Sequence, residues 1–220
     1  MNGFTITLQL RNITGFTWQM KNLKAAALTH LGEVGITLFA FLGLNWINEL
    51  VFIQLEQSNG ISWVFIPAGI RLLSTMLFGL AGFEGLLLAG IYLNFWHFDF
   101  HSDFRAWSGA VAGALGPYLA SLLVKHWFDL EPRLKGLSAH RLLFTGVLCG
   151  LMSPVFHHTF MWILTGHVNW TALSAMIVGD TTGILIVLGL AKGLIALAGR
   201  YSLGSHLIRR WTFRDGMKRR

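Results

Sequence analysis

The ionisable residues that lie inside apolar stretches are the ones that could do chemistry in this chain. Arg71 lies within Trp63 to Thr75, WVFIPAGIRLLST, which is otherwise apolar enough to enter a membrane. A guanidinium keeps its charge at neutral pH, so inside a bilayer Arg71 needs a charged partner or a wet cavity. Asp180 lies in another apolar stretch. An ion pair between Arg71 and Asp180 would lower the cost of burying both charges.

Further ionisable residues are predicted to lie at a similar depth. The helices that carry Glu49 and the pair His157-His158 would end on the outer side, where the helices that carry Arg71 and Asp180 would begin. We therefore expect Glu49, Arg71, His157, His158 and Asp180 to gather in the outer half of the membrane. Two interpretations remain open. The cluster is either a structural ion pair that fixes helix packing or an outward-facing polar cavity that binds a small ligand, an anion or a proton.

A metal site and a haem site are the alternatives to this polar cluster. His97, Asp99, His101 and Asp103 alternate along one loop, and alternate residues of an extended segment share a face that could bind a metal ion. The interleaved phenylalanines are typical of an ordinary interfacial loop instead. His157 and His158 point about 100° apart on a helix and would not easily bind one ion. Haem would need His30, which lies near the opposite face, so no cofactor is expected.

The composition is that of a membrane protein. Of the 220 residues 54% are hydrophobic and only 12% are charged, and the mean hydropathy is +0.56. The net charge of +7 comes from basic residues at the ends of apolar runs and in the tail, which favours contact with anionic lipid over nucleic acid. There is no nucleophile elbow, Gly-rich phosphate loop or HExxH motif, so we do not expect an enzyme.

Apolar runs of about 20 residues predict an all-α, polytopic transmembrane bundle. Residues 1–24 are interpreted as a cytoplasmic or interfacial segment, 25–198 as the bundle and 199–220 as a basic cytoplasmic tail. The bundle would contain about six spans, at about Ala25 to Gln54, Ile61 to Gly79, Phe83 to Trp96, Trp107 to Trp127, Arg141 to Leu164 and Thr171 to Ala198. The third is short for a full span.

The distribution of Lys and Arg predicts the orientation. With the N-terminus inside, all of the 17 basic residues except Arg71 and Arg105 fall on the inner side or in the tail. This asymmetry favours an orientation with both termini in the cytoplasm. Glycines four residues apart on three of the predicted helices would let neighbouring backbones approach closely; the pairs are Gly109 with Gly113, Gly146 with Gly150 and Gly179 with Gly183.

Several short motifs resemble MASE1, a bacterial membrane-associated sensor domain. Trp63 followed by Pro67-Ala68-Gly69-Ile70 resembles the opening of the family's second helix, and Gly179-Asp180-Thr181-Thr182-Gly183 resembles its G-D-x-x-G element. Gly116 to Leu123, GPYLASLL, is similar to another of its helices. The likeness covers about residues 35 to 195. Ile66 replaces the family's first proline, six spans are found where the family is described with eight, and no diguanylate cyclase or histidine kinase domain follows.

The resemblance implies signature positions at Trp63, Pro67, Gly69, Gly179 and Asp180. It also implies a free-standing sensory bundle that acts through a membrane or cytoplasmic protein partner. We therefore expect a sensory or scaffolding module in the lipid bilayer that receives a small ligand from the outer side. The alternatives are a small-solute transport component and a structural subunit of a larger membrane complex.

Overall fold

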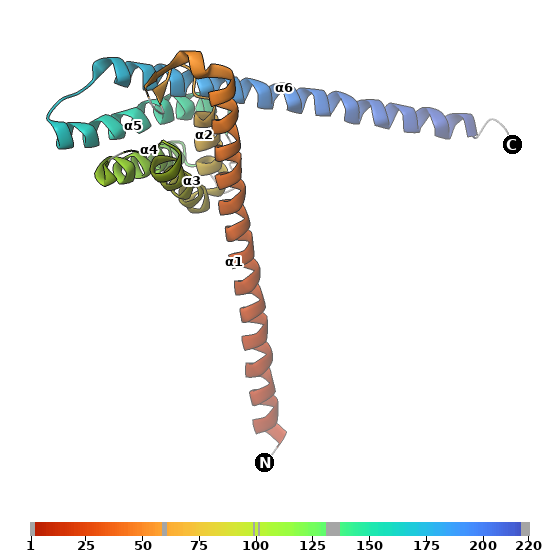
Figure 1. Cartoon of the computed structure of the whole chain (residues 1–220). Coiled ribbons are helices and arrows are strands. Elements are labelled where there is room, and N and C mark those ends of the chain that lie inside the picture. The colour runs from red at the N-terminus through yellow and green to blue at the C-terminus, as the bar shows by residue number, and fades with distance from the viewer. Residues whose placement is uncertain (1–2, 59–60, 99, 101, 131–136, 217–220) are drawn as a thin grey trace.

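The computed structural model describes the backbone of residues 3–58, 61–98, 100, 102–130 and 137–216. Six α-helices dominate these residues (Figure 1). They are α1 (Gly3–Phe52), α2 (Pro67–Phe78), α3 (Leu80–Tyr92), α4 (Asp103–Trp127), α5 (Ala139–Thr165) and α6 (Trp170–Gly216). A 3-10 turn η1 (Ile53–Leu55) and a small antiparallel hairpin of β1 (Glu56–Ser58) and β2 (Ile61–Ser62) follow α1, and a π-helical turn η2 (Leu93–His97) extends α3.

Four segments of the described chain are long and apolar enough to cross a membrane. They are Asn22–Leu55, Asp103–Trp127, Ala139–Thr165 and Trp170–Leu194. Helices α2 and α3 contain 12 and 13 residues and are each shorter than the roughly 20 residues that span a bilayer core. The all-α architecture with six helices is therefore confirmed, and four of the six meet the length and composition of a spanning helix.

The second predicted helix, Ile61 to Gly79, begins later than expected. Residues 61 and 62 belong to β2, and α2 starts only at Pro67, which occupies the first helical turn. Proline suits this position because its missing N–H has no helical acceptor there and its φ angle is already helical. The segment Ser62–Ile66 is thus not helical, which an apolar run alone does not reveal.

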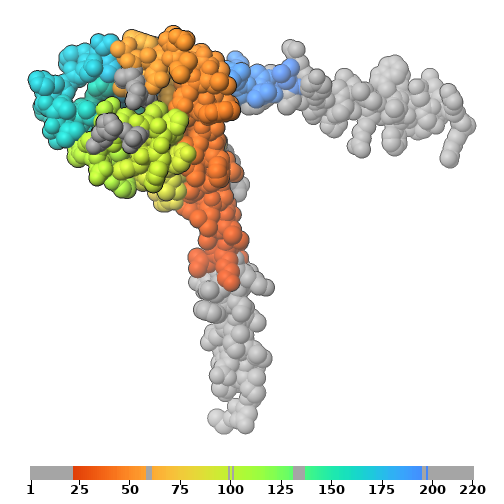
Figure 2. Space-filling view, viewed as in Figure 1, coloured from red at the N-terminus to blue at the C-terminus, as the bar shows by residue number. Residues whose placement is uncertain are grey.

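Neither predicted domain boundary coincides with a break in the backbone. Helix α1 is continuous across residues 24 and 25, and α6 is continuous across residues 198 and 199. The two helices run in clearly different directions from one another (Figure 1). In Figure 2 the described part of α1 extends well beyond the body formed by the other helices.

Glycines set the closest approaches between elements. A Cβ atom at Gly179 or Gly183 would collide with the backbone carbonyl of Ser62 or Phe65, so the segment Ser62–Ile66 lies directly against α6. On α5, a Cβ at Gly146 would lie 2.8 Å from Ile184 Cγ2, and one at Gly150 would lie 2.9 Å from Thr181 Oγ1. Both pairs therefore permit the close backbone packing that their spacing predicted.

Two apolar clusters flank the region around Arg71. One joins α2, α4, α5 and α6 through buried side chains that include Leu72, Met76, Cys149 and Ile184. The other joins α1, α3 and α4 through Phe41, Leu86, Ala89 and Ala114. Outside these clusters many large apolar side chains are exposed, Phe39, Leu50 and Leu190 among them. Such exposure is expected where the surrounding solvent is lipid.

Candidate functional site

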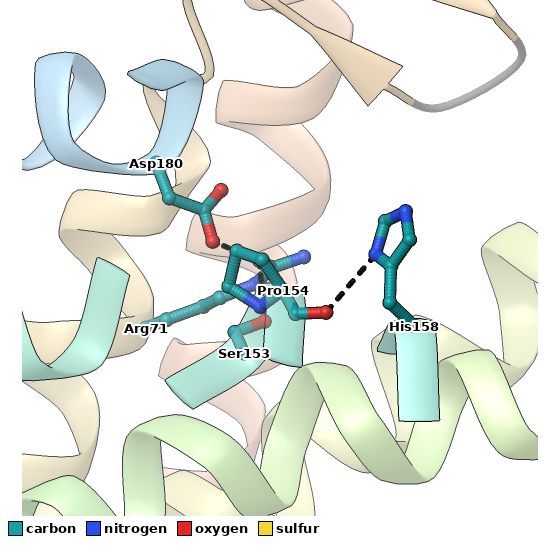
Figure 3. Close-up of polar contacts among 5 residues, drawn as sticks. All are labelled: Arg71, Ser153, Pro154, His158 and Asp180. Atoms are coloured by element: carbon teal, nitrogen blue, oxygen red, sulfur yellow. Dashed lines mark hydrogen bonds and ion pairs between the residues drawn. The ribbon is translucent and has the colours of Figure 1, made fainter. Parts of the chain in front are cut away.

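Arg71 and Asp180 form the ion pair that the sequence predicted. Arg71 Nη1 lies 3.3 Å from Asp180 Oδ2, and the same nitrogen lies 3.4 Å from Ser153 Oγ (Figure 3). Only 11% of the Arg71 side chain and 4% of the Asp180 side chain are exposed. The pair connects α2 to α6, and Ser153 adds a contact from α5, so three helices meet at one guanidinium.

Two aromatic rings hold the same guanidinium. Arg71 Cζ lies 4.8 Å from the centre of the Phe65 ring and 5.2 Å from the centre of the Phe41 ring. A cation above a ring face is attracted by the ring's quadrupole, most strongly where water is excluded. Phe65 is placed by a backbone hydrogen bond of 3.1 Å, which its N–H donates to the carbonyl of Gly179. Both the non-helical segment before α2 and α2 itself therefore position Arg71.

The two adjacent histidines have different surroundings. His158 Nδ1 lies 3.1 Å from the backbone carbonyl of Pro154 (Figure 3). Because a carbonyl only accepts, this contact assigns the proton to Nδ1 and leaves Nε2 as an acceptor. His157 makes no hydrogen bond to any group in the part of the chain that the structure describes. Its ring faces α4, where a Cβ at Gly113 would lie 3.7 Å from His157 Nε2.

Arg71, His157 and His158 line one cavity of about 390 Å³. This volume is within the range of about 300–1,000 Å³ that is common for small-molecule sites. The lining is mostly apolar and includes Leu86, Leu93, Met161 and Met176. Among the described residues that line it there are two arginines and three histidines, and there is no aspartate or glutamate.

The third glycine pair faces this cavity instead of packing two helices together. A Cβ at Gly113 would lie 3.7 Å from both Arg71 Nη2 and His157 Nε2, and one at Gly109 would lie 2.8 Å from Asn94 Nδ2. Asn94 is oriented by a 2.9 Å hydrogen bond that its amide donates to the carbonyl of Ala106. The absence of side chains at Gly109 and Gly113 leaves space beside Arg71 and His157.

Glu49 is the one predicted member of the cluster that the structure places elsewhere. Its carboxylate lies 2.9 Å from His97 Nε2 and accepts a hydrogen bond of 2.7 Å from Asn45. Glu49 lines a separate, smaller hollow next to the hairpin. The structure brings the other four residues close together, as expected, whereas a predicted depth does not determine which face of α1 carries Glu49.

The proposed metal ligands lie only partly within the described residues. Asp99 and His101 lie outside them, while His97 contacts Glu49 and Asp103 occupies the first turn of α4. Within the described ranges no three His, Cys, Asp or Glu side chains are grouped closely enough to bind a metal ion. His30, the histidine that haem binding would have required, lies 2.7 Å from Glu84.

The remaining signature positions hold the site together. Pro67 starts α2, and a Cβ added at Gly69 would collide with the Val187 side chain of α6. Gly179 receives the Phe65 segment, and the next residue is Asp180 itself. Trp63 lies in the non-helical segment, and its N–H donates a 3.0 Å hydrogen bond to the carbonyl of Leu55.

Arg105 is a member of the cavity that sequence reasoning missed. Its Cζ lies 4.3 Å from the centre of the Phe100 ring, and both residues line the cavity. Arg105 was recognised only as the single basic residue on the predicted outer side. That isolation was the available signal, because it sets Arg105 apart from the basic residues that the orientation rule accounts for.

No protein-family model matches the sequence, and no curated protein or solved structure is similar to the chain. The resemblance to MASE1 therefore stays a prediction that rests on its short motifs.

Proposed function

We propose that this chain is an integral membrane sensory module that binds a small ligand beside Arg71 and acts through a partner protein. In this proposal the chain lies in a bacterial inner membrane with both termini in the cytoplasm, and the cavity opens toward the outer side. The motifs that resemble MASE1 support the sensory role, since Pro67, Gly69, Gly179 and Asp180 all lie at or beside the Arg71 site.

The cavity is the observation that carries the proposal. Ionisable groups inside membrane-spanning bundles are costly and are usually retained for function. A purely structural ion pair would need no adjoining space, yet Arg71 borders a cavity of about 390 Å³. Residues from all six helices line it, including Phe41, Arg71, Leu86, Gly113, His157 and Ala172. A ligand that contacts every helix can change their relative positions, which a partner could then detect.

A solute transport component is the second candidate, and the non-helical segment before α2 favours it. Transporters often bind substrate next to interrupted helices, because irregular backbone at membrane depth is tolerated where protein or a cavity surrounds it. Here the non-helical Ser62–Ile66 segment lies against α6, and Ile66 N–H donates a 2.9 Å hydrogen bond to Asn48 Oδ1. Both candidate functions would use the same cavity beside Arg71.

Purification from native membranes in mild detergent, followed by native mass spectrometry, tests the proposal. We expect a stoichiometric protein partner that remains with the full chain. A lone chain that moves solute across proteoliposomes would favour the transport component and contradict the sensory module. A partner whose binding and signalling output are both unchanged when Gly113→Leu fills the cavity would favour a structural subunit, because the cavity would then contribute to neither.

A further inference from the structure

We infer that the cavity selects a monocarboxylate with an apolar body, held by Arg71 and His157 through the gap at Gly113. The inference rests on the proposed function only in that it assigns the ligand of the same cavity. It concerns the chemical class of the ligand and not the partner or the direction of signalling.

The first argument is that Arg71 has unused hydrogen-bond donors. A guanidinium carries five N–H groups in a planar fork and binds a carboxylate best through two parallel bonds. Asp180 and Ser153 both contact Nη1, at 3.3 and 3.4 Å. No described residue accepts a hydrogen bond from Nη2, which borders the space over Gly113. Nη1 is thus occupied by two long contacts, and among the described residues the edge that carries Nη2 is free for a ligand.

The second argument is that His157 offers a donor to the same space. A neutral imidazole always carries one N–H, and neither ring nitrogen of His157 is used by the described residues. A Cβ atom at Gly113 would lie 3.7 Å from His157 Nε2 and 3.7 Å from Arg71 Nη2. The two nitrogens are therefore separated by no more than twice that distance, and a carboxylate placed over Gly113 could reach both of them.

Charge balance indicates a monoanion. The charged side chains that line the cavity are Arg71 and Arg105, and Asp180 lies directly behind Arg71. With the histidines neutral these three groups leave one positive charge uncompensated. A bound monocarboxylate would make the site neutral, whereas a phosphate dianion would leave a buried negative charge, which is costly where water is excluded.

The rest of the lining fits an apolar body. Leu86, Leu93, Met161 and Met176 supply apolar surface, and methionines adapt to ligands of irregular shape. Arg105, which is partly exposed and stacked on Phe100, adds positive potential to the same cavity and would attract an anion toward it.

The test is ligand binding by the full chain in detergent, measured by thermal shift and by isothermal titration. The probes are hexanoate and phenylacetate, their amides as neutral isosteres, and hexyl phosphate. We expect both carboxylates to stabilise the protein and to bind about tenfold or more tightly than the amides, since the amides lack the charge that Arg71 recognises. Equal binding of amides, tighter binding of hexyl phosphate or binding of none of these probes would overturn the inference.

Two matched substitutions locate the site. Gly113→Ala places a methyl group over Gly113 at ordinary contact distance, so it should fold normally and weaken hexanoate about tenfold. Gly189→Ala is the control, because a Cβ there has no neighbour within 4 Å. Unchanged hexanoate affinity in Gly113→Ala would overturn the inference. Amides that bind equally well but are weakened by Gly113→Ala would preserve the ligand-binding proposal and exclude only the carboxylate.

Palmitate identifies the source of the carboxylate. A larger stabilisation by palmitate than by hexanoate, again lost in Gly113→Ala, would indicate a fatty acid from the bilayer. The reverse order would indicate a soluble acid from the aqueous phase. Both results support the carboxylate site.

Discussion

Arg71 is held by three kinds of contact at once. Asp180 compensates its charge, Ser153 accepts a hydrogen bond, and Phe41 and Phe65 lie against the guanidinium faces. Each contact comes from a different part of the chain, from α1 and the segment before α2 to α5 and α6. The cost of burying an arginine is therefore shared by groups that the fold brings together.

The ion pair predicts a non-additive response to mutation. Asp180→Leu would leave the Arg71 charge uncompensated, and breaking a buried pair in this way costs about 3–5 kcal/mol of folding stability. The double variant Arg71→Leu/Asp180→Leu removes both charges and should recover most of that lost stability. Thermal unfolding of the single and double variants in detergent measures the coupling. Additive losses would show that the two charges do not stabilise one another.

The sequence predicts which ionisable residues lie together better than it predicts their individual contacts. Arg71, Asp180, His157 and His158 were grouped correctly because charged groups in a bilayer must find one another or a cavity. The aromatic contacts of Phe41 and Phe65 were not predicted, because they depend on the rotation of α1 and on the non-helical backbone at residue 65. Glu49 was misplaced for the same reason, since His97 lies on its side of α1.

At the scale of elements, the contact between the segment Ser62–Ile66 and α6 positions the site. Phe65 N–H donates a hydrogen bond to the carbonyl of Gly179, and the carbonyl of Phe65 lies closely against Gly183. The hydrogen bond satisfies the Phe65 N–H, which would otherwise be unpaired in an apolar environment. Because Asp180 lies between the two glycines on α6, the same contact brings the start of α2 close to Asp180.

The contact predicts a large difference between two glycine substitutions on one helix. Gly183→Ala would drive a methyl group into the carbonyl of Phe65, so α2 must shift and the protein should lose about 2 kcal/mol or more of stability. Gly189→Ala meets no neighbour within 4 Å and should stabilise α6 by up to about 1 kcal/mol through helix propensity. Thermal unfolding of the two variants is the measurement. Similar stabilities would show that α6 and the segment before α2 are not in contact.

Helix existence was predictable and helix start points were less so. The six apolar runs correspond to the six helices, because only a helix satisfies its own backbone in lipid. The second run contains both the non-helical segment and α2, and hydrophobicity does not distinguish them. Pro67 was the available signal for the start of α2, since proline favours the first helical turn. The π-helical turn at the end of α3 had no such signal in the sequence.

At the scale of the whole molecule, the short helices raise the question of how often the chain crosses the membrane. The chain could cross six times, or four times with α2 and α3 as a re-entrant pair. Each long loop lies on the same side of the membrane in one arrangement as in the other. The two arrangements differ only in the position of the turn at Gly79, where φ is +58° and glycine is favoured. The distribution of basic residues is therefore consistent with both arrangements.

Lengths and one contact favour six crossings. The 12-residue helix α2 covers about 18 Å and the non-helical segment Ser62–Ile66 adds at most about 16 Å, so the two together can cover a core of about 30 Å. Lys125 Nζ donates a 3.4 Å hydrogen bond to the carbonyl of Thr75 near the end of α2. Lys125 lies two residues before the end of α4, so the Gly79 turn lies near the same membrane boundary as the α4 terminus.

Labelling of single cysteines by an impermeant maleimide distinguishes the two arrangements. In a Cys149→Ser background, Leu80→Cys should react only from the cytoplasmic side, as Asp129→Cys does, because Leu80 follows the turn and is 51% exposed. Gln57→Cys, in the hairpin, should react only from the outer side. Reaction of Leu80→Cys from the outer side, or from neither side, would contradict six crossings. The turn would then lie within the bilayer, and the cavity beside Arg71 would be bounded by a re-entrant pair whose tip could move when a ligand binds.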